Sequence, residues 1–449
     1  MTLTRIVGGE VLDANGRRKT DLVVNDETGL IVDTAGEQVL ADLELDATGC
    51  LVLPGLVDIH AHLRQPGSEL SETIESAALA AAVGGYTAVV AMPDTDPCVD
   101  NAAAVNDVLA LAKAVKCEVV PAGAATRGRK GVDLAPVGEL VAVGVRLFSD
   151  SGSTIQNAGV MRRVLEYVDG IGAADGLQLV VAQCPQMDTL TGLMNEGALS
   201  STLGLSGQPA LAEELMVARD IGLAQLVGAR LHLQGLSTAG SVEAVRRAKA
   251  SGASVTAEVT PHHLVLTEQA CATYDPNTKV SPPLRTETDR QALWAGLADG
   301  TIDAVATDHG PCPADSKERP FDHAPFGVIG LETALPLLAT EIESGDIKAR
   351  IQLDQVIAAL SWQPAAIVGL SNRHGGPLVP GASANICVFD PNKTWTLNRS
   401  TMVSRSSNTP FAGRELHGAV RHTVFAGTPV VANGAVVDST GTDGAAVGS

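Results

Sequence analysis

The stretch Asp58-Ile59-His60-Ala61-His62-Leu63-Arg64 decides the fold that the sequence predicts, because here an apolar run ends in two histidines. Side chains alternate across a β-strand, so Asp58, His60 and His62 share one face. Two imidazoles at this spacing can ligate one metal ion. A single histidine on an apolar strand is usually a hydrogen-bonded core residue, but a pair at the end of a first strand indicates a metal site.

Apolar, strand-like runs alternate with Ala-rich helical stretches, and the run with the paired histidines is the first of eight. Strands of a parallel sheet that is buried on both faces read as nearly continuous apolar runs. Eight such units over roughly 250 residues are typical of a (β/α)8 barrel, so the sequence predicts an α/β fold with a TIM-like barrel. A doubly wound open sheet is the alternative, but no glycine fingerprint follows an early strand. The eight runs are Gly55 to His62, Tyr86 to Met92, Glu118 to Gly123, Val143 to Asp150, Leu177 to Cys184, Ala229 to Leu236, Ser254 to His263, and Ile302 to His309.

Short β-rich runs separated by Gly, Asn and Asp occupy both ends of the chain. They are Thr4 to Leu12, Thr20 to Asn25, Gly29 to Val32 and Cys50 to Leu53 at one end, and Ala384 to Asp390, Thr394 to Leu397 and Ala419 to Val437 at the other. Neither end has enough strands for a stable sheet of its own. We therefore expect one small β-sandwich domain made from residues 1–53 and 378–440. The barrel domain is expected at residues 54–377, and residues 441–449 are expected to form a disordered tail.

Asp308 closes the last apolar run and supplies a carboxylate to the expected site. In a barrel of this kind the carboxyl ends of the strands converge, so Asp308 is expected near His60 and His62. By itself, an aspartate at this place can also be a helix N-cap or an ordinary strand end. Beside paired histidines, a carboxylate can bind a metal and carry a proton from water to a leaving nitrogen. We predict Asp308 as both metal ligand and catalytic base.

The composition excludes several classes of partner. The formal net charge is −20 and neither Lys nor Arg forms a run, which is not the pattern of a nucleic-acid-binding protein. No apolar run approaches the ~20 residues that a membrane-spanning helix needs, and the first residues lack a signal-peptide core. Seven cysteines without a CxxC pair predict no disulfide framework, and most are expected to be buried hydrophobes. We expect a cytoplasmic protein whose partner is a small molecule or another protein.

Several motifs together resemble the dihydroorotases, the cyclic amidohydrolases of pyrimidine biosynthesis in the amidohydrolase superfamily. The resemblance covers almost the whole chain; hydantoinases and allantoinases are near relatives. It implies that metal-activated water opens the ring amide of dihydroorotate to give N-carbamoyl-aspartate, and that the same site closes the ring. It also implies that Arg64 grips the substrate carboxylate with its forked guanidinium, whereas a surface salt bridge is the plainer interpretation of that arginine. The motifs are the stretch from Pro54 to Gly67, Gly84-Gly85-Tyr86-Thr87, Met92-Pro93, Ser149-Asp150, Ser237-Thr238-Ala239-Gly240, Thr260-Pro261-His262-His263-Leu264, Pro282-Pro283-Leu284-Arg285, Thr307-Asp308-His309, Phe326-Gly327, and Gly330-Leu331-Glu332-Thr333.

The chain departs from the resembled family at positions that are implied to bind substrate. Asp94 stands where the family has an asparagine, and its negative charge should weaken the binding of an anionic ligand. Ser281 replaces an asparagine before Pro-Pro-Leu-Arg, and Cys312 replaces a histidine four residues after the catalytic aspartate. Phe326 and Gly327 keep the family pattern and are expected to offer backbone contacts to the substrate.

Three positions that the resemblance implies as metal ligands also differ. Ser151 stands in place of a bridging aspartate, Cys184 in place of the histidine of the fifth strand, and Gly235 in place of the histidine of the sixth. A thiolate can bind zinc, whereas a neutral hydroxyl is a poor substitute for a bridging carboxylate and glycine offers no ligand.

The neighbours of these positions are not expected to compensate. Asp150 is adjacent to Ser151, and adjacent strand residues point to opposite faces. His232 is retained, but the family position is not a ligand, and a structural role is expected. A site with one zinc ion on His60, His62 and Asp308, and an open position for water, is therefore favoured over a binuclear site.

Three hypotheses follow. The first is an active one-metal dihydroorotase. The second is a catalytically inactive dihydroorotase-like subunit that scaffolds aspartate carbamoyltransferase. The third is a cyclic amidohydrolase of altered specificity, because Asp94, Ser281 and Cys312 together would reshape the pocket. A homo-oligomer is expected.

Overall fold

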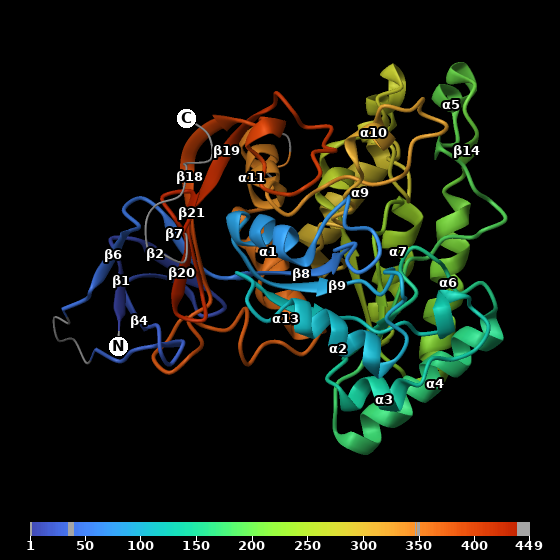
Figure 1. The fold of residues 1–449 in the computed structure, drawn as a ribbon. Helices are drawn as coiled ribbons and strands as arrows, with labels where there is room; N and C mark the ends of the chain where they lie inside the picture. Colours follow the sequence, from blue (N-terminus) through green and yellow to red (C-terminus); the bar gives the residue numbers. More distant parts are fainter. Residues whose placement is uncertain (1, 35–39, 346, 348–350, 438–449) are drawn as a thin grey trace.

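The chain has 449 residues, and the computed structural model describes residues 2–34, 40–345, 347 and 351–437. It is an α/β protein in which the strands of both chain ends lie on one side of a larger part built from alternating strands and helices (Figure 1). The disordered tail predicted at residues 441–449 lies outside the described residues.

Eight parallel strands form the centre of the alternating part, and each lies inside one of the eight predicted runs. Three of them pair in the order β10-β9-β8, and five pair in the order β11-β12-β15-β16-β17. Parallel bridges join the two sheets at both edges, between Gly123 and Phe148 and between Ala61 and His309. The strands are β8 (Leu56–Ala61), β9 (Tyr86–Ala91), β10 (Glu118–Pro121), β11 (Leu147–Ser149), β12 (Val180–Gln183), β15 (Leu231–Leu233), β16 (Val255–Val259) and β17 (Ala304–Val305).

Burial on both faces explains the continuous apolar runs. Every residue of β8 and β9 is buried. On one face, Val57, Ile59 and Val90 belong to a cluster that also contains Ala365 of helix α13 (Trp362–Ile367). Residues of the other face pack on the surrounding helices. A strand in this position has no solvated side, so the sequence shows no alternation of polar and apolar residues.

The observed strands are shorter than the predicted runs. The run from Ser254 to His263 ends in a helix, α8 (Pro261–Val265), because Pro261 takes the first helical position and the Thr260 side chain caps His263 N–H. Capping boxes begin two further helices, at Thr73 before α1 and at Thr286 before α9. The other helices of the described residues are α1 (Ile74–Val83), α2 (Ala102–Leu111), α3 (Val137–Ala142), α4 (Ala158–Asp175), α5 (Ala198–Leu203), α6 (Leu211–Val227), α7 (Ala239–Ala250), α9 (Glu287–Ala298), α10 (Ala314–Lys317), α11 (Ala334–Glu343) and α12 (Leu353–Leu360), with short 3-10 turns at η1 (Arg127–Arg129), η2 (Glu268–Thr273), η3 (Pro276–Thr278) and η4 (Arg399–Thr401).

The two ends of the chain share one sheet. A seven-stranded sheet has the order β21-β20-β19-β18-β7-β2-β3, and a four-stranded sheet has the order β5-β4-β1-β6. In the larger sheet, β7 from the N-terminal part pairs antiparallel with β18 from the C-terminal part, from Pro54 opposite Ile386 to Leu51 opposite Phe389. These strands are β1 (Leu3–Val7), β2 (Glu10–Asp13), β3 (Gly16–Lys19), β4 (Leu22–Asn25), β5 (Leu30–Ile31), β6 (Leu43–Asp46), β7 (Leu51–Pro54), β18 (Ile386–Thr396), β19 (Glu415–Phe425), β20 (Thr428–Ala432) and β21 (Ala435–Val436), and a separate pair is β13 (Met194–Asn195) with β14 (Gly207–Gln208).

Two strands of the N-terminal part were not predicted from the sequence. β3 has the sequence Gly-Arg-Arg-Lys, and its residues are exposed or half-buried. β6 buries one residue, Leu45, of its four. Polar residues at a sheet edge give no apolar run, so the hydrophobic pattern used for the other strands cannot find them.

All seven cysteines are free, and five of them are buried, which confirms the expectation that most act as small hydrophobes. Among the residues that the structure describes, no helix combines the length and the apolar composition needed to cross a membrane.

A buried carboxylate in α6 gives a prediction on stability and pH. Asp220 is fully buried, and its Oδ1 accepts hydrogen bonds from the neighbouring Arg219 while Oδ2 has no partner. Burial raises the pKa of Asp220 to about 6 from 3.8. Because the native pKa lies above the unfolded one, the protonated carboxyl favours the native state below pH 4, and this contribution is lost as the pH rises through 6.

The variant Asp220→Asn removes this ionisation. We compare the free energy of unfolding of the variant with that of the unchanged protein at the same pH. This difference is expected to shift in favour of the variant by on the order of 2 kcal/mol from pH 4 to pH 8. Denaturant titrations of both proteins at the two pH values measure the difference. An equal effect of the substitution at pH 4 and pH 8 would contradict the raised pKa.

Candidate active site

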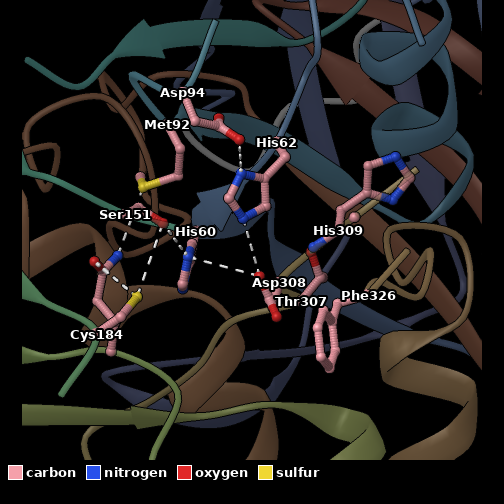
Figure 2. Close-up of polar contacts among 12 residues, drawn as sticks. His60, His62, Met92, Asp94, Ser151, Cys184, Thr307, Asp308, His309 and Phe326 are labelled. Atoms are coloured by element: carbon pink, nitrogen blue, oxygen red, sulfur yellow. Dashed lines mark hydrogen bonds and ion pairs between the residues drawn. The ribbon is translucent and has the colours of Figure 1, made fainter. Parts of the chain in front are cut away.

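The paired histidines and the predicted base meet at the carboxyl ends of adjacent strands. His60 is the second-last residue of β8, His62 follows this strand directly, and Asp308 follows β17. The backbone N–H of His62 donates to the carbonyl of His309 at 2.9 Å, which fixes the two strand ends against each other. His62 Nε2 lies 3.1 Å from Asp308 Oδ1, and His60 Nε2 lies 3.6 Å from the same oxygen; Figure 2 draws both contacts as dashed lines. Residues almost 250 positions apart in the chain therefore form one group.

The donor atoms of this group suit a divalent cation. One ligand atom from each of His60, His62 and Asp308 lies within 4.8 Å of the others. Two imidazole nitrogens and one carboxylate are ligands that zinc accepts in catalytic sites, where a fourth position stays open for water. The residues present therefore fit one metal ion.

The backbone and the neighbours of Asp308 hold its carboxylate in place and ionised. Asp308 has a φ of 47°, in the left-handed region that non-glycine residues rarely adopt and that is often found at functional sites. Burial favours the protonated form, but the hydrogen bond from His62 and the charge of His60 hold the pKa of Asp308 below its usual range. One residue earlier, Thr307 N–H donates to the buried Asp58 at 3.0 Å, which ties β17 to β8.

A buried glutamate that the sequence analysis did not identify orients His60. Glu258, on β16, accepts a hydrogen bond from His60 Nδ1 at 2.6 Å and another from His232 Nε2 at 2.9 Å. All three side chains are at most 3% exposed. Burial opposes the ionisation of Glu258, but the two imidazoles bring its pKa below the usual value. With Nδ1 bound to a carboxylate, His60 directs Nε2 toward the site, an arrangement common for metal-binding histidines. His232 has the structural role that the sequence analysis expected.

Asp94 has a role that the sequence did not indicate. Its Oδ2 accepts hydrogen bonds from His62 Nδ1 and from Arg64 Nη1, both at 2.8 Å (Figure 2 shows the bond to His62). Burial favours the neutral acid, but His62 and Arg64 hold the pKa of Asp94 below its usual range. Asp94 is thus the carboxylate that orients the second histidine, as Glu258 orients the first. The negative charge of Asp94 is paired with the positive charge of Arg64.

The other half of the expected metal site contains neutral, hydrogen-bonded side chains. Ser151 Oγ lies 2.9 Å from His60 Nε2 and 3.8 Å from Cys184 Sγ (Figure 2). The same thiol lies 3.8 Å from the amide oxygen of the buried Gln234. Gly235 has a φ of 60°, and a Cβ there would meet only Pro282, at 3.8 Å.

Asp150 does not compensate for Ser151. Its Oδ1 accepts from the backbone N–H groups of Ala125 and Thr126 at 2.9 and 3.0 Å, and its Oδ2 accepts from the Thr126 hydroxyl. Both oxygens of the Asp150 carboxylate therefore accept hydrogen bonds from the loop after β10. This side chain points away from that of Ser151, as expected for adjacent residues at a strand end.

The chain is similar to known proteins over nearly its whole length. The family profile described as dihydro-orotase-like matches residues 49–241. A dihydroorotase from Pelotomaculum thermopropionicum is 43% identical over 433 residues, which make up 95% of this chain and 98% of that protein. The chain belongs to the dihydroorotase family. Dihydroorotases from Leifsonia xyli and Streptomyces coelicolor are each 44% identical and cover 98% and 97% of the chain, and 98% and 99% of their own lengths.

Solved structures show the same fold as this dihydroorotase-family chain. An L-hydantoinase (dihydropyrimidinase) from Arthrobacter aurescens has a TM-score of 0.85 at 24% identity, with 98% of each chain covered. A dihydropyrimidinase from Brevibacillus agri has a TM-score of 0.82 at 24% identity, covering 97% of this chain and 96% of its own. The metal dependence of the dihydroorotase family agrees with the group of His60, His62 and Asp308.

Most residues expected to bind the substrate of a dihydroorotase instead contact other groups of the protein. The Cys312 thiol is buried and donates to the carbonyl of Phe326 at 3.4 Å. Gly327 N–H donates to the carbonyl of Lys279 at 3.0 Å, so this backbone donor is already used. The Phe326 ring is 38% exposed and lies under the Lys279 ammonium at 4.8 Å. Ser281 is exposed.

Proposed function

We propose that this protein catalyses the reversible hydrolysis of the cyclic amide of dihydroorotate to N-carbamoyl-aspartate, a step of pyrimidine biosynthesis, at a site with one zinc ion. The observation that carries the proposal is the convergence of His60, His62 and Asp308 at two neighbouring strand ends. Relatives named dihydroorotase that align over nearly the whole chain support the reaction.

The proposal includes the architecture that holds the site. Residues 54–377 would form a closed (β/α)8 barrel, and residues 1–53 with 378–440 would form a composite β-sandwich domain. The parallel bridges at both edges of the two central sheets support closure. In such barrels the active site lies at the carboxyl ends of the strands, where His60, His62 and Asp308 are found.

In the proposed mechanism the residues of the site hold the metal ion, transfer a proton and orient the two imidazoles. His60, His62 and Asp308 would hold the zinc ion, which when bound lowers the pKa of a water molecule and polarises the scissile carbonyl. The Asp308 carboxylate accepts a proton from the attacking water and delivers it to the ring nitrogen as the C–N bond breaks. Glu258 and Asp94 keep the two imidazoles turned toward the site. Ring closure uses the same transfers in the opposite direction.

Metal removal tests the proposal directly. The purified protein is expected to contain one equivalent of zinc and to interconvert dihydroorotate and N-carbamoyl-aspartate. Dialysis against a chelator should abolish both directions of the reaction, and added zinc should restore them, because the three ligands supply all the protein contacts in this proposal. Zinc-loaded protein without turnover in either direction would overturn it.

A second candidate is a non-catalytic dihydroorotase-like subunit. It is favoured by one specific observation, the replacement of three ligand positions by Ser151, Cys184 and Gly235. In this candidate the partner is aspartate carbamoyltransferase, and the complex should survive purification from the native cells while the chain binds no zinc. A cyclic amidohydrolase of altered specificity is the third hypothesis, and a panel of cyclic amides tests it. Assembly as a homo-oligomer and a cytoplasmic location stay predictions.

The variant Asp94→Asn separates the two contacts of that carboxylate. The amide loses the charge that holds Arg64, so the KM for the anionic dihydroorotate is expected to fall about tenfold. The bond to His62 weakens at the same time, so zinc affinity should fall by about tenfold or more. Steady-state kinetics at saturating zinc and a zinc titration measure the two effects. A higher KM with unchanged zinc affinity would contradict the role assigned to Asp94.

A further inference from the structure

The guanidinium that the family resemblance assigns to the substrate carboxylate is already engaged. Arg64 donates through Nη1 to Asp94 Oδ2 at 2.8 Å and through Nε to the carbonyl of Pro311 at 3.3 Å. Bidentate hydrogen bonding to a carboxylate uses two neighbouring N–H groups on one edge of the guanidinium. One edge consists of Nε and Nη2, and the other consists of Nη1 and Nη2. Because Nε and Nη1 both donate to protein acceptors, neither edge has two unused N–H donors. The ion pair with Asp94 also removes most of the net charge of Arg64.

A second arginine near the site has no such commitments. The Arg129 side chain forms no hydrogen bond or ion pair with any residue in the described part of the chain, and its Nε is buried without an acceptor. A buried N–H group without a partner is unfavourable, because it has lost its hydrogen bonds to water and gained none in the protein. An acceptor supplied by a ligand would remove this cost.

The Arg129 guanidinium lies close to Ser151, which contacts the metal-binding group. A Cβ added to Gly152 would lie 3.6 Å from Arg129 Nη2, so the guanidinium lies beside the residue that follows Ser151. Ser151 Oγ in turn lies 2.9 Å from His60 Nε2.

The loop that carries Arg129 is held in a defined shape. Thr126 N–H donates to Asp150 at 3.0 Å, and Gly131 N–H donates to the Thr126 hydroxyl at 2.9 Å. Arg129 itself has a φ of 57°, a conformation that costs a residue with a side chain energy and that glycine adopts freely. A strained arginine in an anchored loop keeps its guanidinium at a fixed place.

We propose that Arg129 binds the carboxylate of the anionic substrate, in the place that Arg64 has given up to Asp94. This inference rests on the proposed function, because it names the residue that recognises the charge of dihydroorotate. The Arg129 guanidinium donates no hydrogen bond within the described chain, whereas Arg64 donates two, and the positive charge of Arg129 offsets the negative charge of Asp94 for an incoming anion.

The test compares ligands with and without a carboxylate. Orotate is a planar carboxylate-bearing pyrimidine that the reaction does not open, and uracil has the same ring without the carboxylate. Calorimetric titration of the zinc-loaded protein with both ligands should show orotate binding that falls roughly tenfold to a hundredfold in Arg129→Gln, with uracil affinity unchanged. The KM for dihydroorotate should rise by a similar factor while kcat stays nearly constant.

Arg127→Gln is the matched control. Arg127 lies in the same turn, carries the same charge and is exposed, so its loss should change orotate affinity by less than twofold. Arg129→Gly is the second variant, because glycine accepts the positive φ and leaves the loop unstrained. It should weaken orotate binding as much as Arg129→Gln does.

The outcomes separate this inference from the proposed function. Equal losses for orotate and uracil in the Arg129 variants would assign Arg129 a structural role and overturn the inference. Unchanged orotate affinity in the Arg129 variants, with a loss in Arg64→Gln, would also overturn it. If the unchanged protein neither binds orotate nor turns over dihydroorotate, both the inference and the proposed function fail.

Discussion

Replacing His60 with alanine is expected to remove tightly bound zinc and to lower the rate of dihydroorotate hydrolysis by roughly three orders of magnitude, the scale seen when a catalytic group is removed. The imidazole is one of three donors in the group, and its Nε2 lies 3.6 Å from Asp308 Oδ1. The substitution also leaves the buried Glu258 with His232 as its remaining imidazole partner. Zinc content, measured by elemental analysis after gel filtration, and initial rates give the two readouts.

Two further variants make this result interpretable. His323→Ala is the control, because His323 is 75% exposed and lies outside the metal-binding group. It should retain zinc and activity. His60→Asn keeps a polar side chain beside Glu258, which limits the loss of stability, and it should still lose zinc. Full zinc content in both His60 variants would contradict the assignment of His60 as a ligand.

Restoring the missing half of the site is expected to have the second-largest effect. The triple variant Ser151→Asp, Cys184→His and Gly235→His supplies the bridging carboxylate and the two imidazoles that the family pattern contains. It should bind a second zinc equivalent, and kcat should rise by about a hundredfold, because two ions share the stabilisation of the developing charge. Elemental analysis and steady-state kinetics measure both quantities.

The backbone at Gly235 limits this experiment. With a φ of 60°, a histidine there is strained by about 1–2 kcal/mol, although a Cβ meets only Pro282 at 3.8 Å. Gly235→Ala measures the strain alone, and the double variant at Ser151 and Cys184 measures the gain without it. A second zinc ion without any increase in kcat would show that the present site is not limited by the missing ligands. The loss of all zinc from the triple variant would contradict the prediction that the restored ligands bind a second ion.

Asp94 shows where residue-by-residue reasoning from the sequence was incomplete. The sequence shows a negative charge at a position implied to face an anionic substrate, and that charge alone predicts weaker binding. The structure adds His62 and Arg64, both at 2.8 Å from the same carboxylate oxygen. The carboxylate is therefore a hydrogen-bond partner of His62, a ligand in the proposed zinc site, and in this proposal it affects the substrate indirectly, through Arg64.

Glu258 and Arg129 could not be found from the sequence. Glu258 lies in an apolar strand, and a buried glutamate has no local signature that separates it from an exposed one until its partners are known. Arg129 sits in a polar loop among other basic residues, where an exposed position is the ordinary interpretation. Glu258 gains its role from contacts with His60 and His232, which lie on other strands, whereas the role proposed for Arg129 rests on the place of its side chain beside the site.

The sequence by itself determined the eight central strands, the place of the paired histidines and the family. These features rest on local patterns: continuous apolar runs, the spacing of His60 and His62, and motifs of a few adjacent residues. Only the tertiary structure decided which groups face one another, because parallel strands bring together residues such as His62 and Asp308 that no local pattern connects. It also decided which charges are free. Arg64 is paired with Asp94 and Arg129 has no partner in the described chain, a difference that depends on through-space distance and not on residue type.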